Sequence, residues 1–267
     1  CSNFCFEILI QTILYSIVSF IGIPLNLSIC YITLKYREKY STIKSKTSIF
    51  LFIKSFCECF HQFGNFISLL FSLNGIYFLN ILDILKWLYI PLIFSSLSFF
   101  LLISISLDRI MAVFLPIFYN NVNYKKYIGI HILFLIFTSI FSNFNSLNTL
   151  LNLSNTTTIN VSITLGDAAA VIVGLSNEMN ILTGFIICLV IINYLIVAIW
   201  AKIKIEPHYS VIYNSTYHIG GYFLSYTASI MIIYLTNSTP LKLFYISFLS
   251  NLYFNIANAS IAPIVYF

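Results

Sequence analysis

The stretch 106–119 reads SLDRIMAVFLPIFY and closes a long apolar run. From Trp87 to Leu107 the run carries no charged side chain, and it then meets the adjacent pair Asp108 and Arg109. Charge is costly in hydrocarbon, so charged groups at the end of a membrane helix usually have a function. We therefore take Asp108 and Arg109 as candidate functional residues and examine the rest of the chain around them.

The composition describes a membrane protein. Of the 267 residues, 60% are hydrophobic and only 8% are charged, and the mean hydropathy is +0.94. Soluble domains carry about 25% charged residues, so this chain has too little charge to cover a water-soluble globule. Its apolar runs are also too long for barrel strands. We expect an all-α membrane protein, with residues 1–267 as a single domain.

Seven apolar runs are long enough to cross the membrane. About 20 helical residues span the ~30 Å of hydrocarbon, and a helix satisfies every backbone group in lipid. The predicted membrane helices are Ile8–Leu34, Thr47–Phe71, Ile81–Val113, Tyr127–Asn145, Asn180–Ala201, His218–Leu235 and Leu243–Phe267. The chain is thus predicted to form a seven-helix bundle with lipid around it.

The basic residues predict the orientation of this bundle. Of the 13 Lys and Arg residues, all except Lys54, Lys86 and Lys242 lie in segments that share one side of the membrane. Lys and Arg concentrate in cytoplasmic loops, so the N-terminus is predicted outside and the C-terminus inside, in the plasma membrane. This distribution also explains the net charge of +5 without nucleic-acid binding. Candidate glycosylation sequons lie on the predicted outer side, at Asn152, Asn155, Asn160 and Asn237.

The second predicted helix carries a polar stripe. Lys54, Glu58, His61 and Asn65 follow one another at i, i+4, i+7 and i+11, and therefore share one face. Ionisable groups within a membrane almost always face the bundle interior. The alternative for Lys54 is that its long side chain reaches the inner interface.

Further polar residues on the first and seventh helices extend this pattern. Asn26 lies in mid-membrane and needs a hydrogen-bonding partner. Asn251, Asn255 and Asn258 form another stripe, and Pro263 kinks or ends its helix near the inner side. The predicted intramembrane polar network comprises Asn26, Lys54, Glu58, Asn255, Asn258, Pro263 and Tyr266. Polar helix packing alone is the alternative explanation.

Together these motifs resemble rhodopsin-family (class A) G-protein-coupled receptors, whose third helix ends in Asp-Arg-Tyr. Here Ile110 replaces the Tyr, and Ala262 replaces the first residue of the Asn-Pro-x-x-Tyr motif. The overall pattern is similar to nematode serpentine chemoreceptors of the Srsx-like kind. The resemblance implies a chemosensory receptor that transmits binding of a small molecule or peptide to a heterotrimeric G protein. It implies no enzymatic activity and no cofactor.

The resemblance also implies roles for single residues. Arg109 would pair with Asp108 in the closed state and be released in the open state, with Tyr194 as a candidate acceptor. Glu58 would take the place of the acid that helps to hold a sodium ion. Lys54 takes that place instead if the first cytoplasmic loop has its usual length, but Glu58 is favoured because it preserves the charge. We expect the Lys54 ammonium to substitute for the sodium.

One typical feature is missing, and one other protein class fits part of the pattern. The extracellular disulfide is absent, since its helix-three Cys would lie near Ile84 and the long outer loop has no Cys. That loop must be held in another way or be mobile. The alternative class is a multi-pass transporter or ion-conducting protein, in which Lys54, Glu58 and His61 would relay ions. Inverted repeats are expected there, but the chain shows none, and the receptor is favoured.

Overall fold

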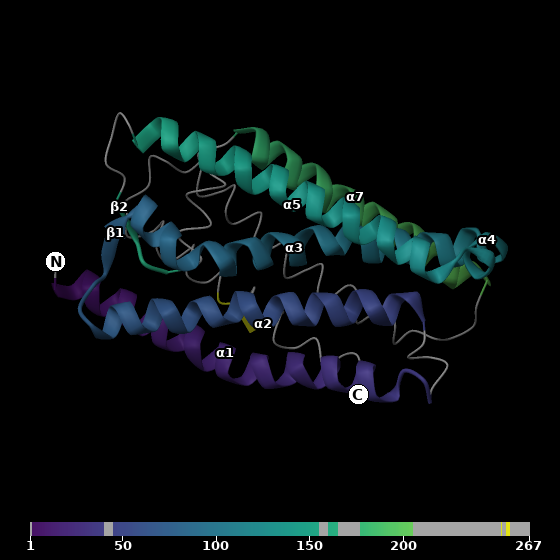
Figure 1. The fold of residues 1–267 in the computed structure, drawn as a ribbon, viewed down its shortest axis with the longest axis horizontal. Helices are drawn as coiled ribbons and strands as arrows, with labels where there is room; N and C mark the ends of the chain where they lie inside the picture. The colour runs from purple at the N-terminus through teal and green to yellow at the C-terminus, as the bar shows by residue number, and fades with distance from the viewer. Residues whose placement is uncertain are drawn as a thin grey trace.

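The computed structural model describes residues 2–39, 45–154, 160–164 and 177–204, together with Leu252, Asn255 and Ile256. Long helices run side by side along the molecule (Figure 1), and their bounds are α1 (Ser2–Tyr36), α2 (Lys46–Leu73), α3 (Ile81–Phe114), α5 (Tyr124–Ser154) and α7 (Asn177–Lys204). A short helix α4 (Pro116–Asn121) lies at one end of the bundle, and the strands β1 (Phe78–Asn80) and β2 (Asn160–Ser162) lie at the other.

The predicted helical character is confirmed over the described residues. Helices α1, α2, α3 and α7 correspond to the first, second, third and fifth predicted helices. Each is longer than predicted, by one to six residues at every end that differs. Helix α5 continues from the predicted end at Asn145 to Ser154, because polar residues can remain helical once the chain has left the lipid. The sixth and seventh predicted helices lie outside the described residues, apart from Leu252, Asn255 and Ile256.

Three helices in the described part are long and apolar enough to cross a membrane: Cys5–Tyr36, Ile81–Phe114 and Tyr124–Asn145. A shorter apolar helical segment, Gly184–Val197, lies within α7. Seven spans therefore remain a prediction.

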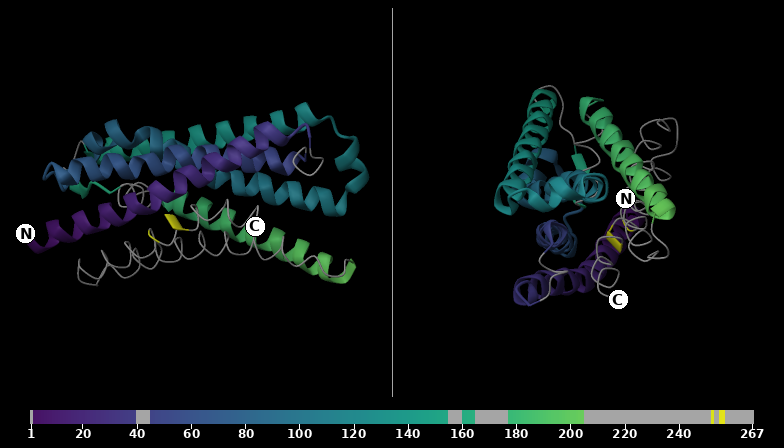
Figure 2. Two further views of the ribbon diagram at one scale, coloured as in Figure 1. Left: turned by 90° about the horizontal axis from the view of Figure 1, so that it is seen from below. Right: turned by 90° about the vertical axis from the view of Figure 1, so that its right-hand side faces the viewer.

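Helix α2 has the reverse of a soluble helix's pattern. Its outward phenylalanines Phe56, Phe60 and Phe63 are 43%, 40% and 57% exposed, whereas Glu58 and Gln62 are fully buried. In water this arrangement would expose apolar side chains and bury polar ones, which is unfavourable. In lipid the apolar side chains face the hydrocarbon, and the polar groups face the other helices. Helix α2 packs between α1 and α3, and α3 packs in turn against α5 and α7 (Figure 1, Figure 2). Helix α3 is thus the centre of the described bundle.

Side-chain caps and a glycine turn define how α2 and α3 begin and join. The Ser45 side chain accepts a hydrogen bond from the Ser48 backbone N–H at 3.2 Å, and the Asn80 side chain accepts one from the Leu82 N–H at 3.0 Å. After α2 the chain turns at Gly75, whose φ of +75° favours glycine. The end of α2 and the start of α3 are therefore set by local sequence.

A pair of short strands fastens the loop between α5 and α7 to the start of α3. Strand β1 pairs antiparallel with β2, with Phe78 opposite Ser162, and the Ile163 N–H donates to the Tyr77 carbonyl at 3.2 Å. Ile163 is only 1% exposed. Backbone pairing thus holds the loop where the missing disulfide was expected to act, at least over residues 160–164.

Candidate functional site

The structure forms two buried polar clusters along α2, 11 residues apart, or about 16 Å of helix. We define the Asp108 cluster as Thr47, Asp108, Tyr119 and Tyr127. We define the Glu58 cluster as Lys54, Glu58, His61 and Ser98. Each cluster is built around one fully buried carboxylate.

Three hydroxyl groups from three different helices hold the Asp108 carboxylate. Thr47 of α2 donates to Oδ2, while Tyr119 of α4 and Tyr127 of α5 donate to Oδ1 at 3.0 and 3.2 Å. Helix α4 can present Tyr119 because α3 ends before Pro116, which lacks the N–H needed to continue it and suits the first helical position. Hydrogen bonds to an ionised acceptor are strong, so Asp108 ties α3 to three neighbours.

The predicted ion pair between Asp108 and Arg109 is absent from the structure. Both residues belong to the described part of the chain, yet no ion pair joins them. Asp108 is fully buried and its oxygens accept the three hydroxyls, whereas Arg109 is partly exposed. Successive helical residues point in directions about 100° apart, so Asp108 can face inward while Arg109 does not.

The aromatic members of the Asp108 cluster also bind a lysine. The Lys46 ammonium donates to the Tyr119 carbonyl oxygen and lies 4.0 Å from the centre of the Tyr119 ring and 5.0 Å from that of Tyr127. A cation over an aromatic face is attracted by the ring. Burial and the nearby Asp108 charge raise the pKa of Tyr119, so Tyr119 remains a neutral donor at physiological pH.

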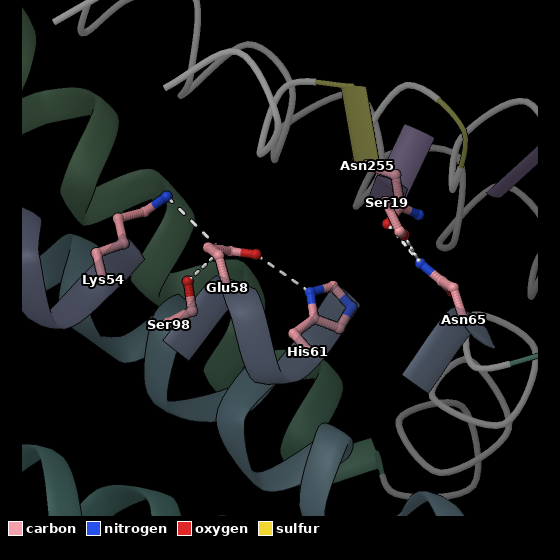
Figure 3. Close-up of polar contacts among 7 residues, drawn as sticks. All are labelled: Ser19, Lys54, Glu58, His61, Asn65, Ser98 and Asn255. Atoms are coloured by element: carbon pink, nitrogen blue, oxygen red, sulfur yellow. Dashed lines mark hydrogen bonds and ion pairs between the residues drawn. The ribbon is translucent and has the colours of Figure 1, made fainter. Parts of the chain in front are cut away.

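In the Glu58 cluster, both oxygens of the Glu58 carboxylate contact neighbouring side chains (Figure 3). The Lys54 Nζ lies 3.7 Å from Oε1, which also accepts from the Ser98 hydroxyl of α3. The His61 Nδ1 lies 3.2 Å from Oε2, and since a carboxylate only accepts, this nitrogen carries a proton. Lys54 is 3% exposed, so the alternative in which it reaches the membrane interface is wrong.

A hydrogen-bonded junction lies beyond the Glu58 cluster and joins α1, α2 and Asn255 (Figure 3). The Asn65 side-chain amide donates to the Ser19 hydroxyl at 2.8 Å and to the Asn255 amide oxygen at 3.1 Å. The Ser16 hydroxyl donates to the Asn65 carbonyl at 3.2 Å. The helical segment with Asn255 is therefore docked to the stripe on α2, at Asn65.

The other predicted residues fall at various places. Asn26 is fully buried in α1. Asn152 is exposed in the last turns of α5, and Asn160 is the first residue of β2, so neither belongs to an irregular loop. Five predicted residues lie outside the described part of the chain: Asn155, Asn237, Asn258, Pro263 and Tyr266. Within that part, no group of three His, Cys, Asp or Glu side chains is placed to hold a metal ion.

Several functional contacts were not predicted. Ser98 lies ten residues before Asp108, in a run that reads as plain apolar helix. Thr47 is separated from its partner Asp108 by 61 residues. On α7 the Asn193 amide, next to the predicted Tyr194, donates to the Ser106 hydroxyl of α3 at 3.1 Å. The small polar residues within apolar helices were the available signal for these contacts.

Comparison with known proteins identifies the family of the chain. The model of the family described as serpentine type 7TM GPCR chemoreceptor Srsx matches residues 16–266. No curated protein matched the chain. The match decides between the receptor and the transporter, and it assigns a chemosensory function with coupling to G proteins rather than an enzymatic activity. The chain therefore belongs to the Srsx family of serpentine seven-transmembrane G-protein-coupled chemoreceptors.

Proposed function

We propose that residues 1–267 form one seven-helix receptor domain in the plasma membrane, with the N-terminus outside, the C-terminus in the cytoplasm and an origin in the rhodopsin family. The two ends of the bundle support this orientation. Lys46 bonds to Tyr119 of α4, Arg37 bonds to Tyr124 at the start of α5, and Arg109 lies near the end of α3 that precedes α4. Strand β2, which begins with the sequon residue Asn160, lies at the opposite end of the bundle from α4 (Figure 1). Positive charge is typical of the cytoplasmic side and glycans of the outer side.

The proposed signalling step centres on the Asp108 cluster. A small molecule or peptide enters from the outer side. It binds among α3, α7 (the fifth predicted membrane helix) and the sixth and seventh predicted membrane helices, 218–235 and 243–267. Binding favours a state in which the inner helix ends separate. Because the partners of Asp108 come from α2, α4 and α5, separation must break some of its hydrogen bonds. Arg109, which is not engaged by Asp108, then contacts the heterotrimeric G protein.

The observation that carries this proposal is the three-helix hold on Asp108 beside a partly exposed Arg109. The polar network of Asn26, Lys54, Glu58 and Asn255 would transmit the change along the bundle. Asn258, Pro263 and Tyr266 are proposed to continue it, and Asn152, Asn155, Asn160 and Asn237 are proposed as glycan acceptors.

A ligand screen tests this function. The full chain is expressed in cells with a G protein of broad receptor specificity, and extracellular chemicals are applied while second-messenger output is recorded. We expect a saturable response to at least one chemical class, abolished by Arg109→Ala at equal surface expression. A chemically evoked current that persists without any G protein would contradict the proposal.

A further inference from the structure

A carboxylate buried inside a membrane bundle needs a neutralising cation, and Glu58 is fully buried. The resemblance to rhodopsin-like receptors implies a free sodium ion beside this acid. Whether the residues present fit such an ion depends on what already occupies the two carboxylate oxygens.

With the Lys54 ammonium in place, the described residues around Glu58 do not fit a free cation. One oxygen meets the Lys54 ammonium at 3.7 Å and the Ser98 hydroxyl, and the other meets the His61 N–H at 3.2 Å. The Lys54 ammonium and the His61 N–H present hydrogen atoms and no lone pair to the carboxylate, whereas sodium requires oxygen lone pairs. A second cation would also be repelled by the ammonium, because like charges a few ångströms apart interact strongly away from water.

We infer that Lys54 is the resident cation of Glu58, a tethered ammonium that excludes sodium from this bundle. The position of Lys54 supports the assignment. It lies one helical turn before Glu58 on the same helix face, is 3% exposed, and forms a buried ion pair with Glu58. The ammonium therefore supplies one positive charge without any free ion.

The surroundings would admit a sodium ion if the ammonium were removed. Ser55 and Gln62 flank Glu58 on its helix face, three residues before it and four after it. Both are fully buried, and the Ser55 hydroxyl and both Gln62 amide atoms have no hydrogen-bond partner in the described structure. These oxygens, with the Glu58 carboxylate, are suitable sodium ligands. Removing the Lys54 side chain should thus convert an internal ion pair into a sodium site.

Thermal unfolding of the purified full chain in sodium chloride and in choline chloride, at equal ionic strength, tests the inference. We expect the wild type to unfold at the same temperature in both salts. Lys54→Ala should show a saturable upward shift in sodium, and Lys54→Ala/Glu58→Gln should lose it. Lys54→Met, which fills the space with apolar atoms, should show no shift. Lys86→Ala, at an exposed lysine, controls for general loss of charge.

A saturable sodium shift in the wild type would overturn the inference. So would a folded Lys54→Ala protein that does not respond to sodium. If Lys54→Ala cannot be purified, Lys54→Ser leaves similar space and gives the same comparison. The inference concerns regulation of the proposed receptor, but this measurement needs neither ligand nor G protein. Its failure would leave the proposed function standing, and failure of the ligand screen would leave the sodium result standing.

Discussion

Replacing Tyr127 with Phe removes one hydrogen bond from Asp108 and little else. The Tyr127 ring packs against His131 with centroids 4.7 Å apart and against Phe50 at 6.3 Å, and a phenyl ring keeps both contacts. A hydrogen bond to a charged group contributes about 1.5–3 kcal/mol. For a chain of this size, that loss lowers the unfolding temperature by about 3–12 °C.

A double-mutant cycle separates this bond from other effects of the substitution. With Asp108→Asn as background the acceptor is neutral, and the hydroxyl contributes only about 0.5–1.5 kcal/mol. We therefore expect Tyr127→Phe to cost about 1 kcal/mol less in that background than in the wild type. Tyr89→Phe, at an exposed tyrosine of α3, should leave the unfolding temperature unchanged. Equal losses in the two backgrounds, or no loss in either, would refute the role of Asp108 as a shared acceptor.

A cysteine pair and a single substitution test contacts elsewhere in the molecule. Leu79 and Val161 oppose each other in the β1–β2 pair, so cysteines at these two positions should form a disulfide that closes a loop of about 80 residues. This disulfide should stabilise the fold by up to about 4 kcal/mol, and the non-reduced protein should unfold at a higher temperature than the reduced protein. The single Leu79→Cys variant should show no such difference. Asn65→Leu should cost about 1–3 kcal/mol, because buried groups of Ser19 and Asn255 lose their partner; unfolding at the wild-type temperature would show that the junction contributes nothing.

The helices and the polar stripe of α2 could be predicted from the sequence. Long apolar runs leave little choice but helix in a membrane, and the i, i+4 and i+3 spacings put Lys54, Glu58 and His61 within reach of one another. In the structure Lys54 and His61 both contact Glu58. These features depend on local spacing, which a single sequence contains in full.

Contacts between distant segments could not be predicted. The hydroxyls on Asp108 come from helices whose rotation about their own axes is decided by packing. Nothing local in the sequence therefore shows that Thr47 and Tyr127 bind Asp108. The Asp108–Arg109 ion pair was predicted from the resemblance to rhodopsin-family receptors, but the side chains of successive helical residues point about 100° apart. A three-residue strand such as β1 is also too short to show the alternation of apolar and polar residues by which strands are recognised.

The receptor is proposed to signal through the inner end of α3. Nucleotide exchange on a G protein, measured with the purified receptor reconstituted in membranes, tests this directly. We expect an activating chemical from the ligand screen to accelerate nucleotide exchange in the wild type. It should also do so in the control variant Arg37→Ala, which removes a different arginine, one that donates a hydrogen bond to Tyr124. The same chemical should not accelerate exchange in Arg109→Ala. Wild-type exchange rates in Arg109→Ala, at equal receptor concentration, would contradict the account.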